Sequence, residues 1–248
     1  MQNNNRLTFA CRAAVTAAVL TASSSVLAHT TFETSSMSEG VRVLNNVQIG
    51  HACGTDKRVI ATSVVFPDGA DSTITVNGSA YNGALTDFVS NWGPNIQPLF
   101  SRAVFDETDE KNDANGNVVG FWAGGGPGMP NHMVAYVPFR VNATNIVPTS
   151  CATSVRFRAN IVDVCELSKE SDLKVEGNAH FWTMAGLGTP YDADATAAAS
   201  LTITRNLTSN PLPSNCGSGV AVEVVPSAAQ VIRDTPIKYK GVQVWPTP

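Results

Sequence analysis

The chain has 248 residues, and its 16 Lys and Arg against 20 Asp and Glu give a formal net charge of −4 at pH 7. This balance argues against a nucleic-acid-binding protein, because such proteins need clustered basic residues. Beyond residue 28, no stretch reaches the roughly 20 consecutive apolar residues that a membrane-spanning helix requires, so no membrane span is predicted.

Residues 1–28 have the pattern of an export signal. Arg6 and Arg12 lie in its first part, an apolar run covers 13–20, and small residues lead up to Ala28. The apolar run is too short to cross a bilayer. We therefore expect cleavage after Ala28 and a mature protein that is periplasmic, attached to the cell surface or secreted.

The cysteines fit an exported protein. Cys11 would leave with the signal, and four cysteines remain: Cys53, Cys151, Cys165 and Cys216. An even number in an exported chain predicts two disulfides, although four cysteines allow three pairings and the spacing does not choose between them. The competing interpretation is a thiolate metal site, against which the lack of any C-x-x-C pair argues.

Short β-branched and alternating segments, separated by Gly, Pro and Asn, dominate the rest of the chain. They predict strands at 41–49, 59–66, 72–76, 133–141, 154–164, 174–184, 201–206, 220–225 and 237–244. Asn77-Gly78 predicts a hairpin turn, and 189–199 a short helical turn. No long segment has a helical period. The pattern predicts an all-β protein, an antiparallel β-sandwich of the immunoglobulin or cupredoxin type with long loops.

Two segments look like ligand-binding loops but fail the detailed test. In the acidic segment 106–117, aligning Gly116 with the sixth place of a calcium loop puts Lys111 first and Trp122 twelfth, and neither can coordinate calcium. We expect a solvated hairpin loop there. The glycine run 121–128 lacks the G-K-[ST] sequence and the following helix of a phosphate loop.

Cleavage after Ala28 would make His29 the first residue, with its α-amine and ring Nδ1 in chelating position, a pair of nitrogens that suits copper. The other histidines are His51, His132 and His180, and none has the spacing of a zinc-protease motif. For each of them the alternative is an ordinary surface or hydrogen-bonded side chain. Trp182, two residues after His180 on an expected strand, would face the same way as that histidine; its alternative is core packing.

Five segments resemble, in chain order, the YcnI-like family of periplasmic copper-binding proteins (domain of unknown function 1775). The opening His-Thr-Thr-Phe-Glu-Thr at 29–34 is similar to that family's A-H-[IV]-T-[LV]-E-T. Residues 50–69 resemble its H-G-C…T…[IV]-P-[DE]-G block, and 121–125 its W-S-G-G segment. Residues 162–166 resemble V-Q-[ET]-C-E, and 177–182 the G-x-x-x-W stretch that follows it.

The resemblance implies a cupredoxin- or immunoglobulin-like sandwich with a one-histidine copper brace, formed by His29 and a carboxylate beside Trp182. The carboxylate position of the family falls near His51 here, which suggests a second imidazole instead. The resemblance also implies Cys53–Cys165 and Cys151–Cys216 disulfides. A weaker similarity to the copper-repressible surface proteins of methanotrophs, which use two histidines and an oxidised tryptophan, adds interest to His51, His180 and Trp182.

From these features we expect an exported protein that sequesters or delivers copper, and hands it to or takes it from another copper-handling protein. His29 and His51 are the first candidate ligands, followed by His180, His132 and Glu33, with Trp182 as the aromatic neighbour. We expect the copper-binding domain at 29–184 and an extension at 185–248 that matches no family and packs on the same domain.

Two other functions stay open at this point. One is an immunoglobulin-like surface module without metal. The other is a copper monooxygenase, which would need a flat aromatic surface that the sequence does not indicate. No G-x-S-x-G elbow and no convincing catalytic triad is present, so an enzyme is not predicted.

Overall fold

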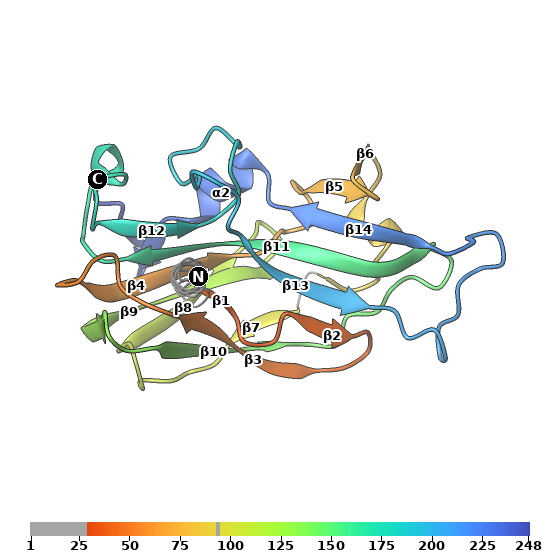
Figure 1. The fold of residues 1–248 in the computed structure, drawn as a ribbon, viewed down its shortest axis with the longest axis horizontal. Helices are drawn as coiled ribbons and strands as arrows, with labels where there is room; N and C mark the ends of the chain where they lie inside the picture. The colour runs from red at the N-terminus through yellow and green to blue at the C-terminus, as the bar shows by residue number, and fades with distance from the viewer. Residues whose placement is uncertain (1–28, 93–94) are drawn as a thin grey trace, which may run out of the picture.

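The computed structural model describes residues 29–92 and 95–248, and the expected export signal, 1–28, lies outside the described residues. Within the described part, β-strands are the dominant regular secondary structure, and they are arranged as a sandwich with long loops (Figure 1). This confirms the predicted all-β fold. No helix among the described residues is long and apolar enough to cross a membrane.

The smaller sheet has four antiparallel strands in the order β1-β3-β10-β7. Its strands are β1 (Thr31–Phe32), β3 (Val43–Ile49), β10 (Ala135–Val141) and β7 (Ile96–Pro98). Side chains on β3 and β10 alternate between buried and more exposed positions, as expected for strands that cover a core with one face.

The larger sheet runs in the order β6-β5-β14-β11-β4-β9-β8, with β12 and β13 also paired to β11 and β2 paired to β13. The pairs β11–β14 and β13–β2 are parallel, and the others are antiparallel. Its strands are β2 (Ser36–Ser38), β4 (Arg58–Val65), β5 (Thr73–Val76), β6 (Ser79–Tyr81), β8 (Glu107–Asn112), β9 (Val118–Pro130), β11 (Ala152–Val164), β12 (Ala179–Trp182), β13 (Ala199–Thr204) and β14 (Val220–Val225).

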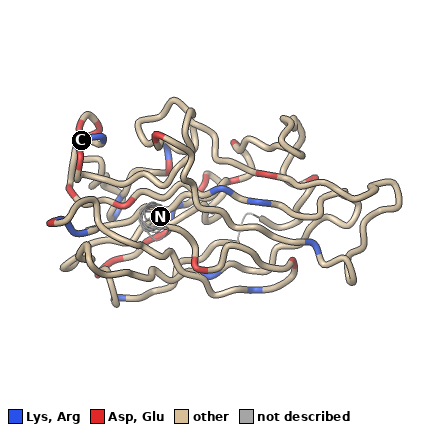
Figure 2. The backbone as a smooth tube through the Cα atoms, in the orientation of Figure 1, with Lys and Arg blue, Asp and Glu red and all other residues tan. Residues whose placement is uncertain are grey.

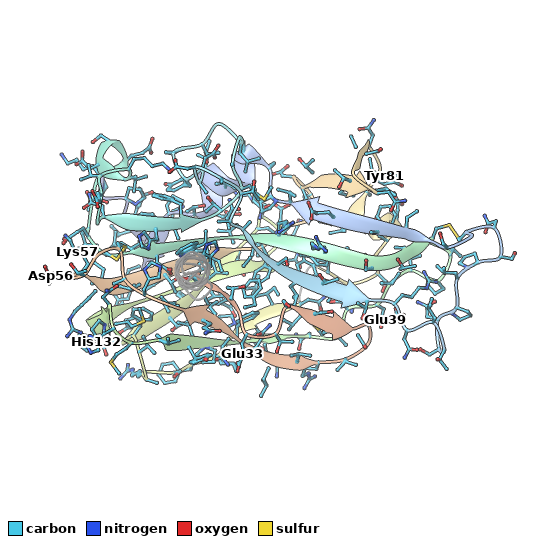
Figure 3. All side chains as sticks on the ribbon, in the orientation of Figure 1. Glu33, Glu39, Asp56, Lys57, Tyr81 and His132 are labelled. Carbon is cyan, nitrogen blue, oxygen red and sulfur yellow. A yellow bond between two sulfur atoms is a disulfide. The ribbon has the colours of Figure 1, made fainter. Side chains whose placement is uncertain are left out.

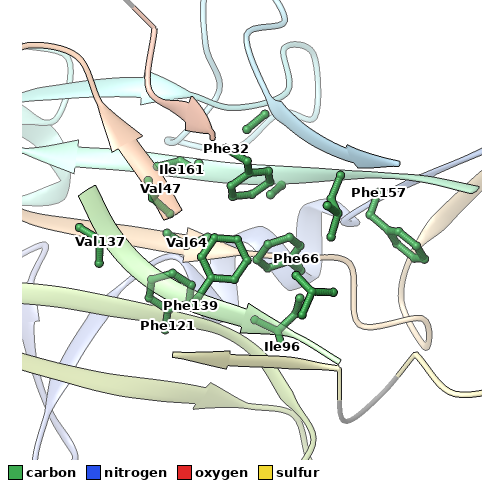
Figure 4. Packing of buried hydrophobic residues seen from close by; sticks show 14 of the residues in the cluster. Phe32, Val47, Val64, Phe66, Ile96, Phe121, Val137, Phe139, Phe157 and Ile161 are labelled. Carbon is green, nitrogen blue, oxygen red and sulfur yellow. The ribbon is translucent and has the colours of Figure 1, made fainter. Parts of the chain in front are cut away.

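The main core fills the space between the two sheets (Figure 4). Phe32 stacks on Phe66 with ring centroids 5.2 Å apart, and Phe139 contacts both of these rings. On β11, Phe157 and Ile161 are fully buried on this side, because residues two apart on a strand share a face. Burial of this apolar surface is the main stabilising contribution to the fold.

A second, smaller core covers the other face of the large sheet. Val162 and Val164 on β11 and Trp122 on β9 pack there with Val231 and Trp245 from the C-terminal segment. That segment forms α2 (Ala228–Asp234) and the hairpin of β15 (Ile237–Tyr239) and β16 (Val242–Trp245). Residues 185–248, which also supply β13 and β14 to the large sheet, are therefore part of the same packed body.

Most predicted strands are present with shifted ends. Two differ more: 174–178, the first half of the strand predicted at 174–184, form turns and a bend, and the strand predicted at 237–244 is a hairpin of two short strands. The helical turn predicted at 189–199 is absent: 189–198 form turns, bends and irregular chain, and Ala199 begins β13.

The acidic segment 106–117 is a solvated loop only at its turn, 113–117; residues 107–112 form β8, which pairs with β9. The glycine run 121–128 lies inside β9. Helix α2 is absent from the predictions, because seven residues make about two turns and give no clear period.

Glycine is required in β9 for close contact with β4. A Cβ added to Gly120 would lie 2.1 Å from the carbonyl oxygen of Val64, so no larger residue fits there. Gly126 has φ +74°, a left-handed conformation that other residues rarely adopt, in the stretch where the register of the two strands shifts.

Lys111 on β8 fastens the C-terminal segment to the large sheet. Its buried ammonium donates to the carbonyl oxygens of Asp234 (2.5 Å), Thr235 (3.2 Å) and Pro236 (2.8 Å), at the C-terminal end of α2 and just after it. Burial lowers the pKa of Lys111 to about 7, against the opposing attraction of Asp234. The three carbonyls thus replace the water that the amine loses on burial.

We expect Lys111→Met to lower the free energy of unfolding by about 2 to 4 kcal/mol, because buried carbonyls lose their donor. Denaturant unfolding at pH 6, where the wild-type amine is protonated, measures the loss. The exposed Lys238→Met is the control and should stay within about 0.5 kcal/mol of wild type. Equal stability of the two variants would contradict this role for Lys111.

Candidate functional site

Three neighbouring strands form the floor of the candidate site. Asp163 on β11 lies directly opposite Thr62 on β4 and directly opposite His180 on β12. Trp182 is opposite Ile161 in the same ladder. Opposed residues project to the same face of a sheet, and residues two apart on a strand do so as well. Thr62, Asp163, His180 and Trp182 therefore share the face of the large sheet that carries Ile161 and the main core.

The indole ring of Trp182 is the centre of the site. Its centroid lies 4.8 Å from the ring of His29, 5.6 Å from that of His180 and 5.9 Å from that of His51. The rings of His51 and His180 are 4.8 Å apart, edge to face. Three of the four histidines, from segments distant in the sequence, thus meet around one tryptophan.

The loop that carries His51 is held from two sides. The N–H of Ala52 donates to Asn131 Oδ1 at 3.1 Å, and Cys53 is bonded to Cys165 at the end of β11. His51 Nδ1 lies 2.7 Å from the carbonyl oxygen of Ala52. A carbonyl can only accept, so Nδ1 carries the proton and Nε2 keeps its lone pair for another partner.

His180 has an unsatisfied nitrogen. Its Nδ1 is buried without a hydrogen-bond partner among the described residues. Burial, and secondarily the nearby charge of His51, lowers the pKa of His180, so its imidazole stays neutral at pH 7. A metal ion could satisfy such a buried, unpartnered imidazole nitrogen. An open pocket of about 310 Å³, lined in part by His180, Cys53 and Gly177, gives access to this residue from solvent.

Beneath the rings lies Asp163, a residue that the sequence did not single out. Its carboxylate accepts hydrogen bonds from Thr30 Oγ1 (2.5 Å), Trp182 Nε1 (2.8 Å) and Thr62 Oγ1 (2.8 Å). Burial raises the pKa of Asp163, and the three hydrogen bonds oppose that rise. The signal in the sequence was a charged residue at the end of the apolar series Val155, Phe157, Ala159, Ile161 on one face of a strand.

As the side chains stand, the described residues contain no group of three or more His, Cys, Asp or Glu that could hold a metal ion. The imidazoles of His51 and His180 are neighbours, whereas His29 contacts the cluster through the indole ring. His29 is exposed at the start of the described chain, so its side chain has room to turn. Three-nitrogen binding would need that rotation.

Two other predicted ligands lie outside the cluster. Glu33 faces solvent on the outer side of the small sheet, where its carboxylate accepts from Asn46 Nδ2 at 2.6 Å. His132 is exposed in the turn before β10 (Figure 3). Phe32 of β1 points into the core, so its neighbour Glu33 must point out. Neither residue contacts the histidines around Trp182.

One disulfide closes each end of β11. Cys165 directly follows the strand and is bonded to Cys53, and Cys151 directly precedes it and is bonded to Cys216. These are the two pairs that the family resemblance implied, and they are confirmed. Two disulfides are typical of proteins that fold in an oxidising compartment, outside the cytosol.

Acidic and basic side chains are interspersed along the described chain (Figure 2).

No protein-family model matches the chain, and no curated protein matches its sequence. Among solved structures, the chain is similar to an uncharacterized protein from Nocardia farcinica with an immunoglobulin-like fold, with 12% identity over 71% of this chain and 98% of that one, at a TM-score of 0.35. It is also similar to a type II cohesin domain from the cellulosome of Acetivibrio cellulolyticus, with 12% identity over 71% and 92%, at a TM-score of 0.26.

We expect the double variant Cys53→Ala, Cys165→Ala to lose about 2 to 5 kcal/mol of unfolding free energy and also to release the His51 loop from β11. The control, Cys151→Ala with Cys216→Ala, should lose a similar free energy but keep that loop in place. Chemical denaturation measures the stability, and the NMR shifts of the His51 ring report its position. Loss of those shifts in both variants to the same extent would show that the first disulfide has no special role at the site.

Proposed function

We propose that this is an exported copper-binding protein that sequesters or delivers copper at the cluster around Trp182. The observation that carries the proposal is the convergence of His29, His51 and His180 on one indole ring. Imidazole nitrogens bind zinc, iron and nickel as well as copper, and among the divalent first-row ions such a site holds copper most tightly.

The donor set supports the proposal in chemical terms. His51 offers Nε2, since its Nδ1 proton is engaged by Ala52, and His180 has a buried nitrogen that lacks a partner. His29, once it is the first residue, adds its α-amine and ring. The indole of Trp182 lies against all three imidazoles, and a cation held over its face would be attracted by its ring electrons.

A second candidate is an immunoglobulin-like surface module without metal. The observation in its favour is that, among the described residues, no group of three donors is arranged to hold an ion without movement. Calorimetric titration of the chain beginning at His29 with Cu(I) and Cu(II) separates the two functions. The first candidate requires about one copper per chain, and the second requires none.

The free α-amine should contribute directly. A mature chain extended by one glycine before His29 replaces that amine with an amide, so we expect copper affinity to fall at least about tenfold without loss of stability. The comparison is a titration of the two chains side by side, with thermal unfolding as the check on folding. Unchanged affinity would remove the amine from the site while leaving the imidazoles in place.

We also expect His51→Ala and His180→Ala to lower copper affinity at least about tenfold each, since each removes one nitrogen donor. His132→Ala and Glu33→Gln are the matched controls, because both side chains are exposed and outside the cluster. Competition against a copper chelator gives the affinities. Equal losses in the controls would mean that copper binds elsewhere on the chain.

A further inference from the structure

Asp163 links Thr30 and Trp182, which are 152 residues apart in the sequence but adjacent in space. Its Oδ2 accepts from Thr30 Oγ1 at 2.5 Å and from Trp182 Nε1 at 2.8 Å. The same oxygen therefore holds the residue next to His29 and the ring on which His29 packs.

The carboxylate itself is fixed from the opposite side. Its Oδ1 accepts from Thr62 Oγ1 at 2.8 Å on β4, and Asp163 is fully buried on β11. A buried carboxylate with three donors from three segments has one favourable position, because loss of any donor would leave charge without compensation. Its place is thus determined by the large sheet rather than by the N-terminal segment.

Near His29, the N-terminal segment has few other hydrogen bonds among the described residues. Strand β1 has two residues, and its first, Thr31, pairs with Gln48 on β3. Thr30 is buried although it precedes this strand, and its hydroxyl hydrogen bond reaches across to the other sheet. His29 directly precedes Thr30 in the chain, so the bond from Thr30 to Asp163 determines whether His29 lies against the indole.

We propose that Asp163 is the positioning residue of the site, which docks the N-terminal arm through Thr30 and orients Trp182, so that His29 is presented to the other two imidazoles. This role rests on the proposed copper function, and it adds the residue on which the geometry of that function depends. Asp163 touches no metal in this account; it acts through Thr30 and Trp182.

The test compares two variants that each lose one buried hydroxyl hydrogen bond. Thr30→Val removes the bond to Asp163, and Ser63→Ala removes a 2.6 Å bond from β4 to the carbonyl oxygen of Thr235 on the opposite face of the sheet. Both should destabilise the fold. We expect only Thr30→Val to raise the copper Kd, by about tenfold, and to abolish the ring-current shift that Trp182 imposes on the His29 ring.

The variant Asp163→Asn is a second test of the positioning role. Its carboxamide has a single acceptor oxygen and no charge, so we expect the Trp182 indole N–H resonance to move upfield and the copper Kd to rise at least as much as in Thr30→Val. A Kd that rises in Ser63→Ala as well, in step with stability, would reduce Asp163 to a purely structural role. An unchanged His29 shift in Thr30→Val would overturn the positioning role outright.

The NMR arm needs no copper, so the two proposals fail separately. If the wild-type chain beginning at His29 ignores copper but Thr30→Val still frees the His29 ring, the positioning is upheld and the copper function is lost. If the wild-type chain binds copper and Thr30→Val changes neither Kd nor shift, the copper function is upheld and the positioning is lost.

Discussion

The register of β11 is the constraint on which the rest of the molecule depends. This strand of 13 residues pairs with β14 and β13 along its first half and with β4 and β12 along its second. A shift of one residue would exchange its two faces, moving Phe157 and Ile161 out of the main core and Val162 out of the second one. The two cores thus fix the register, and the register fixes which residues meet at the site.

The same constraint explains how a carboxylate comes to lie in an apolar face. Once Ile161 must face the core, Asp163 must do so too, and an ionised carboxylate there is unfavourable unless it is hydrogen-bonded. The opposing positions on β4 and β12 carry Thr62 and His180, and the next residue but one on β12 is Trp182. The strand register therefore places two of the three donors to Asp163, Thr62 and Trp182. The third donor, Thr30, comes from the N-terminal segment.

The sequence predicts strands better than it predicts contacts between them. Strand β14 coincides with the expected 220–225, because five of its six residues are valine or alanine and turn residues precede it. The shared face of His180 and Trp182 also follows from their spacing and is confirmed. By contrast, the sequence does not indicate that Glu33, a lower-ranked candidate ligand, lies away from the histidines; the inward Phe32 turns it to the outer face.

The residues that pattern reasoning missed depend on long-range pairing. Two of the three donors to Asp163 are remote in sequence: Thr62 lies more than a hundred residues earlier and Thr30 lies 133 residues earlier. Lys111 lies in a segment that reads as solvated, and it is buried because a C-terminal segment from beyond residue 227 folds over β8 and β9. No local window of sequence contains these partners.

In the proposed copper site, electrostatics would favour one bound metal cation over several bound protons. The rings of His51 and His180 lie 4.8 Å apart, so a charge on His51 makes protonation of His180 less favourable, and burial acts in the same direction on its pKa. Beneath them, the carboxylate of Asp163 keeps its hydrogen bonds as an acceptor, and the plane of the Trp182 indole is close to perpendicular to both imidazoles. Two protonated imidazoles would repel each other across this gap, whereas one cation shared between two neutral rings would not. Neutral imidazoles are also the form that binds metal, so the arrangement that disfavours protons is the one that leaves the nitrogens available.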